Sequence, residues 1–422
     1  MEAQSQHQLN VNFLPYPTPG HMIPMVDTAR LFAKHGVSVT IITTPANALT
    51  FQMAIDSDFN CGYHIRTQVV PFPAAQLGLP DGVENIKDST TPEILGKISH
   101  GISMLKDQIE LLFQDLQPDC IVTDFCYPWT VESAAKLGIP RIFFYSSSYF
   151  SNCVSNSIRK HRPHESLSFD THKFTVPGLP QKIEMIPPQV AEWERTRNET
   201  TSYFDAMFES ESRSYGALYN SFHELEKIAH GLETSGHSFI WVVRKKNGYE
   251  NGHSFLQEFE ERMKESKKGY IIWNWAPQIL ILDHPAIGGI MTHCGWNSIL
   301  ESVSAGLSMI TWPMFAEQSY NEKLVVDVLK IGVPVGVKEM KFWMSLGDEA
   351  MVRREEIVKA VVLLMGSSQE SKEMRKRARK LGDASKKTVE EGGASYNNLI
   401  QLIQELKSLK ISKALGKSRV CN

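Results

Sequence analysis

The stretch from Trp275 to Gln318 reads WAPQILILDHPAIGGIMTHCGWNSILESVSAGLSMITWPMFAEQ. Short apolar runs in it end in clusters of polar and aromatic residues, first at 292–298 and again at Glu317 and Gln318. Trp275 follows a further apolar run at 269–273. In open α/β sheets, ligands bind at the carboxyl ends of the strands. The stretch therefore predicts a parallel sheet whose ligand site is built from these clusters.

The same alternation of strands and helices extends through the rest of the chain. Strands rich in β-branched residues are predicted at 11–15, 37–43, 65–72, 120–124, 141–145, 215–222, 238–243, 269–273, 288–292, 308–312 and 333–337. Periodic apolar positions predict helices at 22–32, 91–114, 130–137, 202–213, 224–235, 296–305, 318–329, 353–365, 370–389 and 395–408. The Pro-rich stretch 159–197 is expected to be an irregular surface excursion near a site. The pattern predicts two doubly wound domains with a cleft between them.

Composition excludes several classes of protein. The chain has 422 residues, 42% of them apolar, and a net charge of -3, which gives no electrostatic case for nucleic acid. Its six cysteines show no CxxC spacing, so neither a disulfide framework nor a zinc knuckle is indicated. The N-terminus lacks the apolar core of a signal peptide, and no run of 18 apolar residues exists. We expect a soluble cytoplasmic protein without a membrane span, in which the glycosylation sequon at 198–200 is inert.

His21 and Asp124 are the first candidates for chemistry. His21 lies in the loop after the first predicted strand, and Asp124 ends another strand of the same sheet. A neutral imidazole can take a proton from a hydroxyl, and a carboxylate on its other nitrogen fixes the tautomer. The alternative is a hydrogen-bonded loop histidine and a helix-capping aspartate, and spacing alone leaves both open.

The cluster at 292–298 predicts an anion site. A helix is expected to begin at Trp296 or Asn297, and its free N–H groups and dipole favour a phosphate. His293, Asn297 and Ser298 add side-chain donors at the same end. An ordinary helix cap with a buried tryptophan accounts for the residues equally well.

Other short motifs are weaker. Asp56-Ser57-Asp58 fits a pattern that can hold a metal and a nucleotide sugar, but we expect a solvated loop there. The Gly-Lys-Ser at 416–418 lacks the upstream glycine of a phosphate-binding loop. The absence of Gly-x-Gly-x-x-Gly argues against a nicotinamide dehydrogenase, and that of Gly-x-Ser-x-Gly against a hydrolase of that type.

The stretch from Trp275 to Gln318 resembles the signature box of plant family 1 UDP-dependent glycosyltransferases. The matching residues are Trp-Ala-Pro-Gln at 275–278, His284, Thr-His-Cys-Gly-Trp-Asn-Ser at 292–298, Glu301-Ser302, Trp312-Pro313 and Glu317-Gln318. Pro19-Gly20-His21 and Val122-Thr123-Asp124 extend the resemblance to the N-terminal half. The likeness is to the group that acts on triterpenoid saponins, such as those that decorate soyasapogenols.

The resemblance implies two facing Rossmann-like domains of the GT-B type. The acceptor would bind to residues 1–225 and the UDP-sugar to residues 226–410, with a tail at 411–422. It further implies an enzyme that transfers a hexose with inversion to a triterpenoid or phenolic acceptor. The partners would be the UDP-sugar and a small-molecule acceptor; a monomer is expected, with no metal or other cofactor and no nucleic acid.

The roles that the resemblance implies are specific to single residues. His21 would be the general base and Asp124 its partner. At the donor site the implied contacts are Trp275 stacking on uracil, Ala276 offering backbone bonds, Gln278 and Glu301 at the ribose, His293, Gly295, Asn297 and Ser298 at the diphosphate, and Trp296, Glu317, Gln318 and Ser146 at the sugar. Glutamine at the last position of the box usually accompanies glucose donors.

The sequence departs from the family between Phe222 and Ser238. Relatives carry several dozen more residues there, including the interdomain linker and the first strand of the second domain. We therefore expect the second domain to lack that strand. The minor departure is Ser308, where the family usually has proline. Three hypotheses follow: an active glucosyltransferase, an inactive variant that retains at most nucleotide or small-molecule binding, and a nucleotide-binding sensor or partner protein without turnover.

Overall fold

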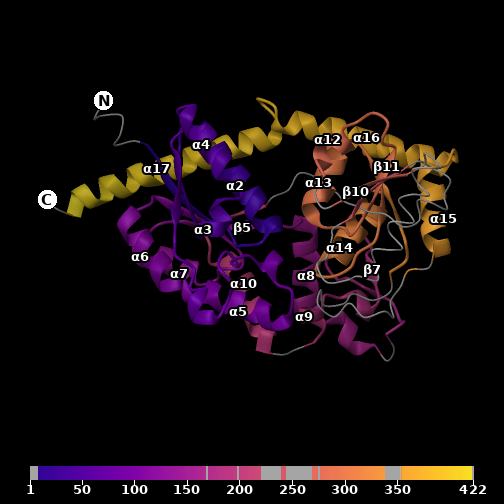
Figure 1. The fold of residues 1–422 in the computed structure, drawn as a ribbon, viewed down its shortest axis with the longest axis horizontal. Helices are drawn as coiled ribbons and strands as arrows, with labels where there is room; N and C mark the ends of the chain where they lie inside the picture. Colours follow the sequence, from indigo (N-terminus) through magenta and orange to yellow (C-terminus); the bar gives the residue numbers. More distant parts are fainter. Residues whose placement is uncertain are drawn as a thin grey trace. The chain divides into compact units, whose positions relative to one another are not determined.

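The computed structural model describes residues 8–167, 170–196, 199–219, 239–243, 269–273, 276–337, 352 and 354–420. The chain groups into two compact units. The first comprises 1–146, 198–220 and 388–422, and the second comprises 147–197 and 221–387. Figure 1 shows the chain coloured along its sequence. The predicted boundary at 225 and the predicted helix at 224–235 lie outside the described residues.

The first unit is built on a six-stranded parallel sheet in the order β3-β2-β1-β4-β5-β8. The strands are β1 (Asn10–Leu14), β2 (Ser38–Thr43), β3 (Ile65–Val69), β4 (Cys120–Asp124), β5 (Arg141–Tyr145) and β8 (Gly216–Tyr219). The strand order reverses between β1 and β4, and ligands bind at such switch points. The predicted α/β class with a parallel sheet is confirmed.

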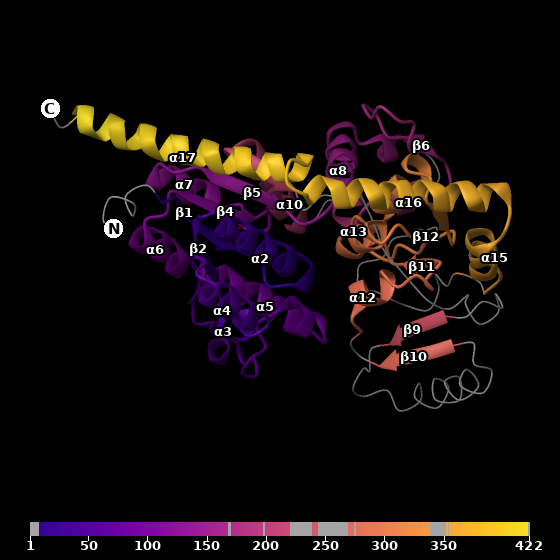
Figure 2. The ribbon, with the colours of Figure 1, turned by 90° about the horizontal axis from the view of Figure 1, so that it is seen from above.

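Helices cover this sheet and complete its core. They are α2 (Pro19–Lys34), α3 (Pro45–Ala48), α4 (Gln52–Asn60), α5 (Pro92–Met104), α6 (Lys106–Leu116), α7 (Thr130–Leu137), α10 (Glu199–Ser212) and α17 (Ala394–Val420), with 3-10 turns η1 (Ala75–Leu77) and η2 (Ile86–Asp88). From α17, Ile403 and Leu406 are buried in the core around β1 and α2. Farther along α17, Lys413 donates to the carbonyl of Gly138 after α7, and the helix continues through residues expected to form a tail (Figure 2).

Three local expectations for the first unit are wrong. The predicted helix at 91–114 is two helices that meet at Leu105. His21 lies in the first turn of α2 and not in the loop before it, because Pro19 is preset for the first helical position. Asp56-Ser57-Asp58 lies within α4 and not in a solvated loop. The Asp58 carboxylate is buried and accepts a 2.5 Å hydrogen bond from Nε of Arg30, which gives it a structural role.

In its described residues, the second unit holds two parallel sheets and a hairpin. One sheet pairs β9 (Phe239–Val243) with β10 (Gly269–Trp273), and Figure 2 shows them side by side. The other has the order β11-β12-β13, formed by β11 (Gly289–Thr292), β12 (Ser308–Thr311) and β13 (Gly332–Pro334). The antiparallel hairpin joins β6 (Phe174–Thr175) and β7 (Glu184–Met185).

The described helices of the second unit are α8 (Tyr149–His161), α9 (Glu192–Arg195), α12 (Gln278–Leu282), α13 (Trp296–Ser304), α14 (Gln318–Lys323), α15 (Arg354–Met365) and α16 (Gln369–Val389). Two 3-10 turns, η3 (Pro163–Ser166) and η4 (Pro187–Gln189), and a π-helix, η5 (Leu324–Val328), complete it. The helix predicted at 318–329 therefore ends at Lys323 and continues as π-helix. Within the described residues, no helix is long and apolar enough to cross a membrane.

The stretch 147–196 is more ordered than its composition suggests. The helix α8 precedes the Pro-rich part and was not predicted from the sequence. Val154 and Ile158 of α8, Ile183 beside the hairpin, Val190 after η4 and Tyr320 of α14 are buried together in one cluster. These contacts explain why the stretch belongs to the second unit. Between the short elements of 159–196, the described residues are irregular, as the Pro-rich composition predicts.

Candidate active site

His21 and Asp124 lie in direct contact. His21 is the third residue of α2, and Asp124 is the last residue of β4, on either side of the switch point. The Nδ1 atom of His21 lies 3.0 Å from Oδ2 and 3.2 Å from Oδ1 of Asp124. The carboxylate is fully buried, whereas the imidazole is 23% exposed. A proton on Nδ1 donates to the carboxylate, and Nε2 is then the atom able to accept a proton.

Aromatic rings surround the imidazole. Phe125 stacks on His21 with ring centroids 5.3 Å apart, and Tyr16 lies at 5.8 Å. Phe125 in turn contacts Tyr145 and Phe208. Burial raises the pKa of Tyr16 well above its ordinary value, so its hydroxyl stays neutral. The aromatic rings around His21 make this surface largely apolar, which suits an apolar ligand beside the imidazole.

The turn after β4 holds the carboxylate in place. Asp124 Oδ1 accepts the backbone N–H of Cys126 at 3.0 Å, and its backbone carbonyl accepts that of Tyr127 at 3.0 Å. His21, Asp124 and Cys126 each offer a metal-ligand atom within 4.8 Å of the others, the one such group in the described residues. Burial raises the pKa of the Cys126 thiol well above its ordinary value, and Nδ1 already faces Asp124. The three residues therefore make a poor metal site, whereas His21 and Asp124 form a hydrogen-bonded pair.

The predicted anion loop connects β11 to α13. β11 ends at Thr292, and α13 begins at Trp296 with Gly295 as its N-cap residue. The Thr292 hydroxyl accepts the N–H of Cys294 at 3.0 Å, while Cys294 has a left-handed φ of 65°. The His293 ring lies over Gly295, where an added Cβ would meet its Nε2 at 2.5 Å. A side chain at this position would therefore displace the His293 ring.

The side chains expected at the diphosphate lie in this loop and in the first turn of α13. Asn297 and Ser298 occupy the first turn of α13, and both are half-buried, as is His293. The first backbone N–H groups of a helix attract anions. The first turn of α13 can therefore offer N–H groups to an anion, and binding of the diphosphate there stays a prediction.

The two residues expected at the ribose also lie together. Gln278 opens α12, and its Nε2 donates to Oε2 of Glu301 on α13 at 2.5 Å. The glutamine thus orients the carboxylate beside the anion loop. Ala276, two residues earlier, is half-buried.

The third part of the predicted donor site lies at the start of α14. Gln318 is 4% exposed, and its Oε1 accepts the N–H groups of Met314 at 2.9 Å and Phe315 at 3.1 Å. With the oxygen held by the turn, the amide NH₂ is the group that can meet a ligand. The Ser147 hydroxyl donates to Glu317 at 2.8 Å, which fixes the carboxylate next to it.

Three further predicted site residues are Trp275, Trp296 and Ser146. Trp275 lies outside the described residues. Trp296 is 4% exposed and packs in the apolar cluster of Ile299 and Leu324, so its backbone N–H is the part suited to a ligand. Ser146 is buried and ends the first segment of the first unit. The sugar and uracil contacts assigned to these residues stay predictions.

Sequence reasoning missed the network that supports α14. Tyr320 donates to Glu194 at 2.5 Å and accepts the N–H of Ala191 at 2.9 Å. Asn321 accepts from the Ser148 hydroxyl at 2.7 Å and donates to the Cys294 carbonyl at 3.1 Å. The polar run that opens α14 was the available signal. Its side chains tie the sugar end of the predicted site to α8 and α9.

The chain matches known proteins over nearly its whole length. The family described as "UDP-glucoronosyl and UDP-glucosyl transferase" matches residues 184–345. A soyasapogenol B glucuronide galactosyltransferase from Glycine max is 46% identical over an alignment of 482 residues, covering 96% of this chain and 97% of the relative. A scopoletin glucosyltransferase from Nicotiana tabacum is 37% identical, covering 94% of this chain and 98% of the relative.

Solved structures agree with these relatives. The crystal structure of Glycyrrhiza uralensis UGT73P12, complexed with glycyrrhetinic acid 3-O-monoglucuronide, superposes with a TM-score of 0.92 at 44% identity, covering 98% of this chain and 99% of that one. Medicago truncatula UGT71G1, complexed with UDP-glucose, has a TM-score of 0.72 at 19% identity, covering 96% of this chain and 100% of that one, and supports the fold alone. The fold is the GT-B arrangement of parallel-sheet units.

Proposed function

This chain belongs to the plant family 1 UDP-glycosyltransferases, and we propose that it transfers a hexose from a UDP-sugar to a triterpenoid that already carries glucuronic acid. The acceptor class is suggested by two relatives. The Glycine max protein is named for soyasapogenol B glucuronide, and the Glycyrrhiza uralensis structure holds glycyrrhetinic acid 3-O-monoglucuronide. Aromatic residues around His21 fit a large apolar ring system.

The contact between His21 and Asp124 carries the proposal. Asp124 holds the Nδ1 proton, and Nε2 takes the proton from the acceptor hydroxyl. The oxygen then forms a bond to the anomeric carbon as the bond to UDP breaks, which inverts that centre. Asp124 stabilises the imidazolium that results. A glycosidase would require two carboxylates around the reacting bond, a different arrangement from a histidine held by one.

The residues from 292 to 301 would bind the leaving UDP. The N-terminus of α13, His293, Asn297 and Ser298 offer donors for the diphosphate, whose charge grows as it leaves. Glu301, oriented by Gln278, has the carboxylate oxygens that accept hydrogen bonds from ribose hydroxyls. Neutral hydrogen-bond donors and the helix dipole of α13 would thus stabilise the negative charge of the leaving UDP.

We assign glucose as the donor sugar on the basis of Gln318. The amide NH₂ of Gln318 is directed by the turn that holds its oxygen, and a fixed donor selects among sugar hydroxyls. The Glycine max relative is a galactosyltransferase, so the two UDP-hexoses must be compared directly.

The test is an incubation of the purified chain with a triterpenoid 3-O-monoglucuronide and either UDP-glucose or UDP-galactose. Mass spectrometry should find a product one hexose heavier, formed faster from UDP-glucose. The free triterpenoid without its glucuronic acid is the matched acceptor control and should react more slowly. Product from the free triterpenoid alone would overturn the acceptor assignment, and faster reaction with UDP-galactose would overturn the donor assignment.

A second candidate function is UDP binding without turnover. The arrangement of the described strands in the second unit favours it. The first unit places β1 at the centre of its sheet, between β2 and β4. The same order in the second unit would put one strand between β9 and β11, where the described residues form two separate sheets. The alignment with the Glycine max relative spans 482 residues, more than the 422 of this chain, so the relative carries segments without a counterpart here.

A missing central strand would reduce stability and activity together. It leaves ladder groups of the flanking strands unpaired, and folded proteins retain only about 5–15 kcal/mol of net stability. Inserting the relative's segment between Phe222 and Ser238 tests this candidate. Product from the restored chain, with UDP binding but no product from the natural chain, would support it. Product from the natural chain would exclude it.

A further inference from the structure

The guanidinium of Arg141 is buried behind the turn that carries Asp124. Arg141 begins β5 and is 2% exposed. Its Nε donates to the hydroxyl of Thr123 at 2.7 Å, and its Nη2 to the backbone carbonyl of Asp124 at 3.4 Å. These acceptors are the last two residues of β4. The arginine therefore contacts the backbone of the residue that orients His21.

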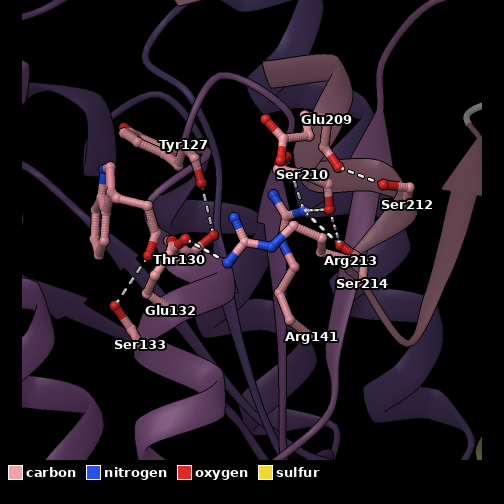
Figure 3. Close-up of polar contacts among 11 residues, drawn as sticks. Tyr127, Thr130, Glu132, Ser133, Arg141, Glu209, Ser210, Ser212, Arg213 and Ser214 are labelled. Atoms are coloured by element: carbon pink, nitrogen blue, oxygen red, sulfur yellow. Dashed lines mark hydrogen bonds and ion pairs between the residues drawn. The ribbon is translucent and has the colours of Figure 1, made fainter. Parts of the chain in front are cut away.

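The other side of the guanidinium contacts the end of α10 (Figure 3). Its Nη1 donates to the Ser214 hydroxyl at 2.7 Å and to the hydroxyl and carbonyl of Ser210, both at 3.3 Å. The last carbonyls of a helix lack helical partners and carry partial negative charge. The negative end of α10 therefore stabilises the buried cation. The Cζ atom of Arg141 also lies 5.1 Å from the centroid of the Phe143 ring.

The contact at Thr123 is continuous with the turn that follows Asp124. The Thr123 and Thr130 hydroxyls are 2.7 Å apart, and Thr130 donates to the Tyr127 carbonyl at 2.7 Å. On α10, the Tyr203 hydroxyl donates to the carbonyl of Cys126 at 2.7 Å. The segment from 123 to 130 is thus linked to α10 directly at Cys126 and, through Arg141, at Thr123.

The chemistry of the site requires arginine. Burial lowers the pKa of Arg141 to about 10, so it remains a cation at neutral pH, and Asp124 supplies the largest attraction that offsets burial. A planar fork reaches acceptors on two elements at once, which the single ammonium of lysine cannot do.

We propose that Arg141 is a positioning residue for the His21–Asp124 pair, fixing the end of β4 against α10. Its effect on catalysis rests on the proposed function, whereas its effect on the pair can be measured without turnover. A displacement of about 1 Å in a catalytic group is enough to lower a rate about 100-fold.

The test uses Arg141→Lys and Thr123→Val, with Ser212→Ala as the matched control. Arg141→Lys keeps the charge and loses the fork, and Thr123→Val removes the acceptor beside Asp124 at nearly constant shape. Ser212 lies on α10 and donates to the carbonyl of Glu209, so its loss leaves the Arg141 contacts intact. Circular dichroism first establishes that each variant is folded.

The readout independent of turnover is the Nδ1–H proton resonance of His21 in histidine-labelled protein, assigned by its loss in His21→Gln. Arg141→Lys and Thr123→Val should shift this resonance, and Ser212→Ala should not. The two variants should also lower kcat at least about tenfold while changing the KM for UDP-sugar less than about twofold.

An unshifted resonance in a folded Thr123→Val or Arg141→Lys variant would overturn the inference, as would an equal shift in Ser212→Ala. If the natural chain makes no product but the resonance shifts as expected, the positioning role stands and the proposed activity fails. An unchanged kcat with unchanged KM in both folded variants of an active chain would also refute the role.

Discussion

Glu194 should make the stability of the second unit fall as the pH rises. Its carboxyl is 2% exposed, between the Ser155 hydroxyl and the Tyr320 hydroxyl. Burial raises its pKa from 4.5 to about 7, although both hydroxyls favour the charged form. Between these values the folded chain retains a proton that the unfolded chain has released. The contribution is therefore complete below pH 4.5 and is lost as the pH rises through 7.

The substitution Glu194→Gln removes this dependence. A shift of 2.5 pKa units corresponds to about 3 kcal/mol, since each unit is worth about 1.4 kcal/mol. Glutamine is neutral at every pH and keeps one oxygen to accept from Tyr320. Part of this contribution is lost below pH 5. When the pH is raised from 5 to 8, the free energy of unfolding of the variant should therefore rise by about 2–3 kcal/mol relative to that of the natural chain.

Urea unfolding followed by circular dichroism at pH 5 and pH 8 measures this difference. Glu322→Gln is the matched comparison, because burial also raises the pKa of Glu322 to about 7, and it should behave similarly. A difference between Glu194→Gln and the natural chain that is the same at both pH values would refute the reasoning.

Other substitutions probe the two halves of the site. Asp124→Asn and His21→Ala should each lower kcat about 100- to 10,000-fold, the range for loss of general-base catalysis, measured as product per time with UDP binding retained. Gly295→Ala should weaken UDP binding at least about tenfold in calorimetry, because its Cβ displaces the His293 ring; unchanged affinity would contradict the predicted anion site. Gln318→His should reduce the rate with UDP-glucose relative to UDP-galactose in parallel assays, and an unaltered ratio would argue against the assignment of the donor.

The sequence predicts the frame of the site because strands and their ends carry local signals. Thr292, Trp296 and Asp124 lie at the strand and helix ends where the alternation predicts them. The contact between His21 and Asp124 follows from the order of β1 and β4, which places both at one switch point.

Long-range hydrogen bonds could not be predicted in this way. Glu194 and Tyr320 lie 126 residues apart, and neither has a pattern that identifies the other as its partner. The same holds for Arg141 and Ser214, which are 73 residues apart. The helix α8 was missed because its polar serines and asparagines obscure its apolar face, which the tertiary contacts of Val154 and Ile158 stabilise.

The most direct test of the proposed function is product formation by the natural chain and by His21→Ala. Each is incubated with UDP-glucose and a triterpenoid 3-O-monoglucuronide, and the product is followed by mass spectrometry. The proposal predicts a product one hexose heavier from the natural chain and a rate lowered at least about 100-fold in His21→Ala. No product from the natural chain with either UDP-hexose, while the chain with the restored segment makes it, would contradict the claim that this chain is an active glycosyltransferase.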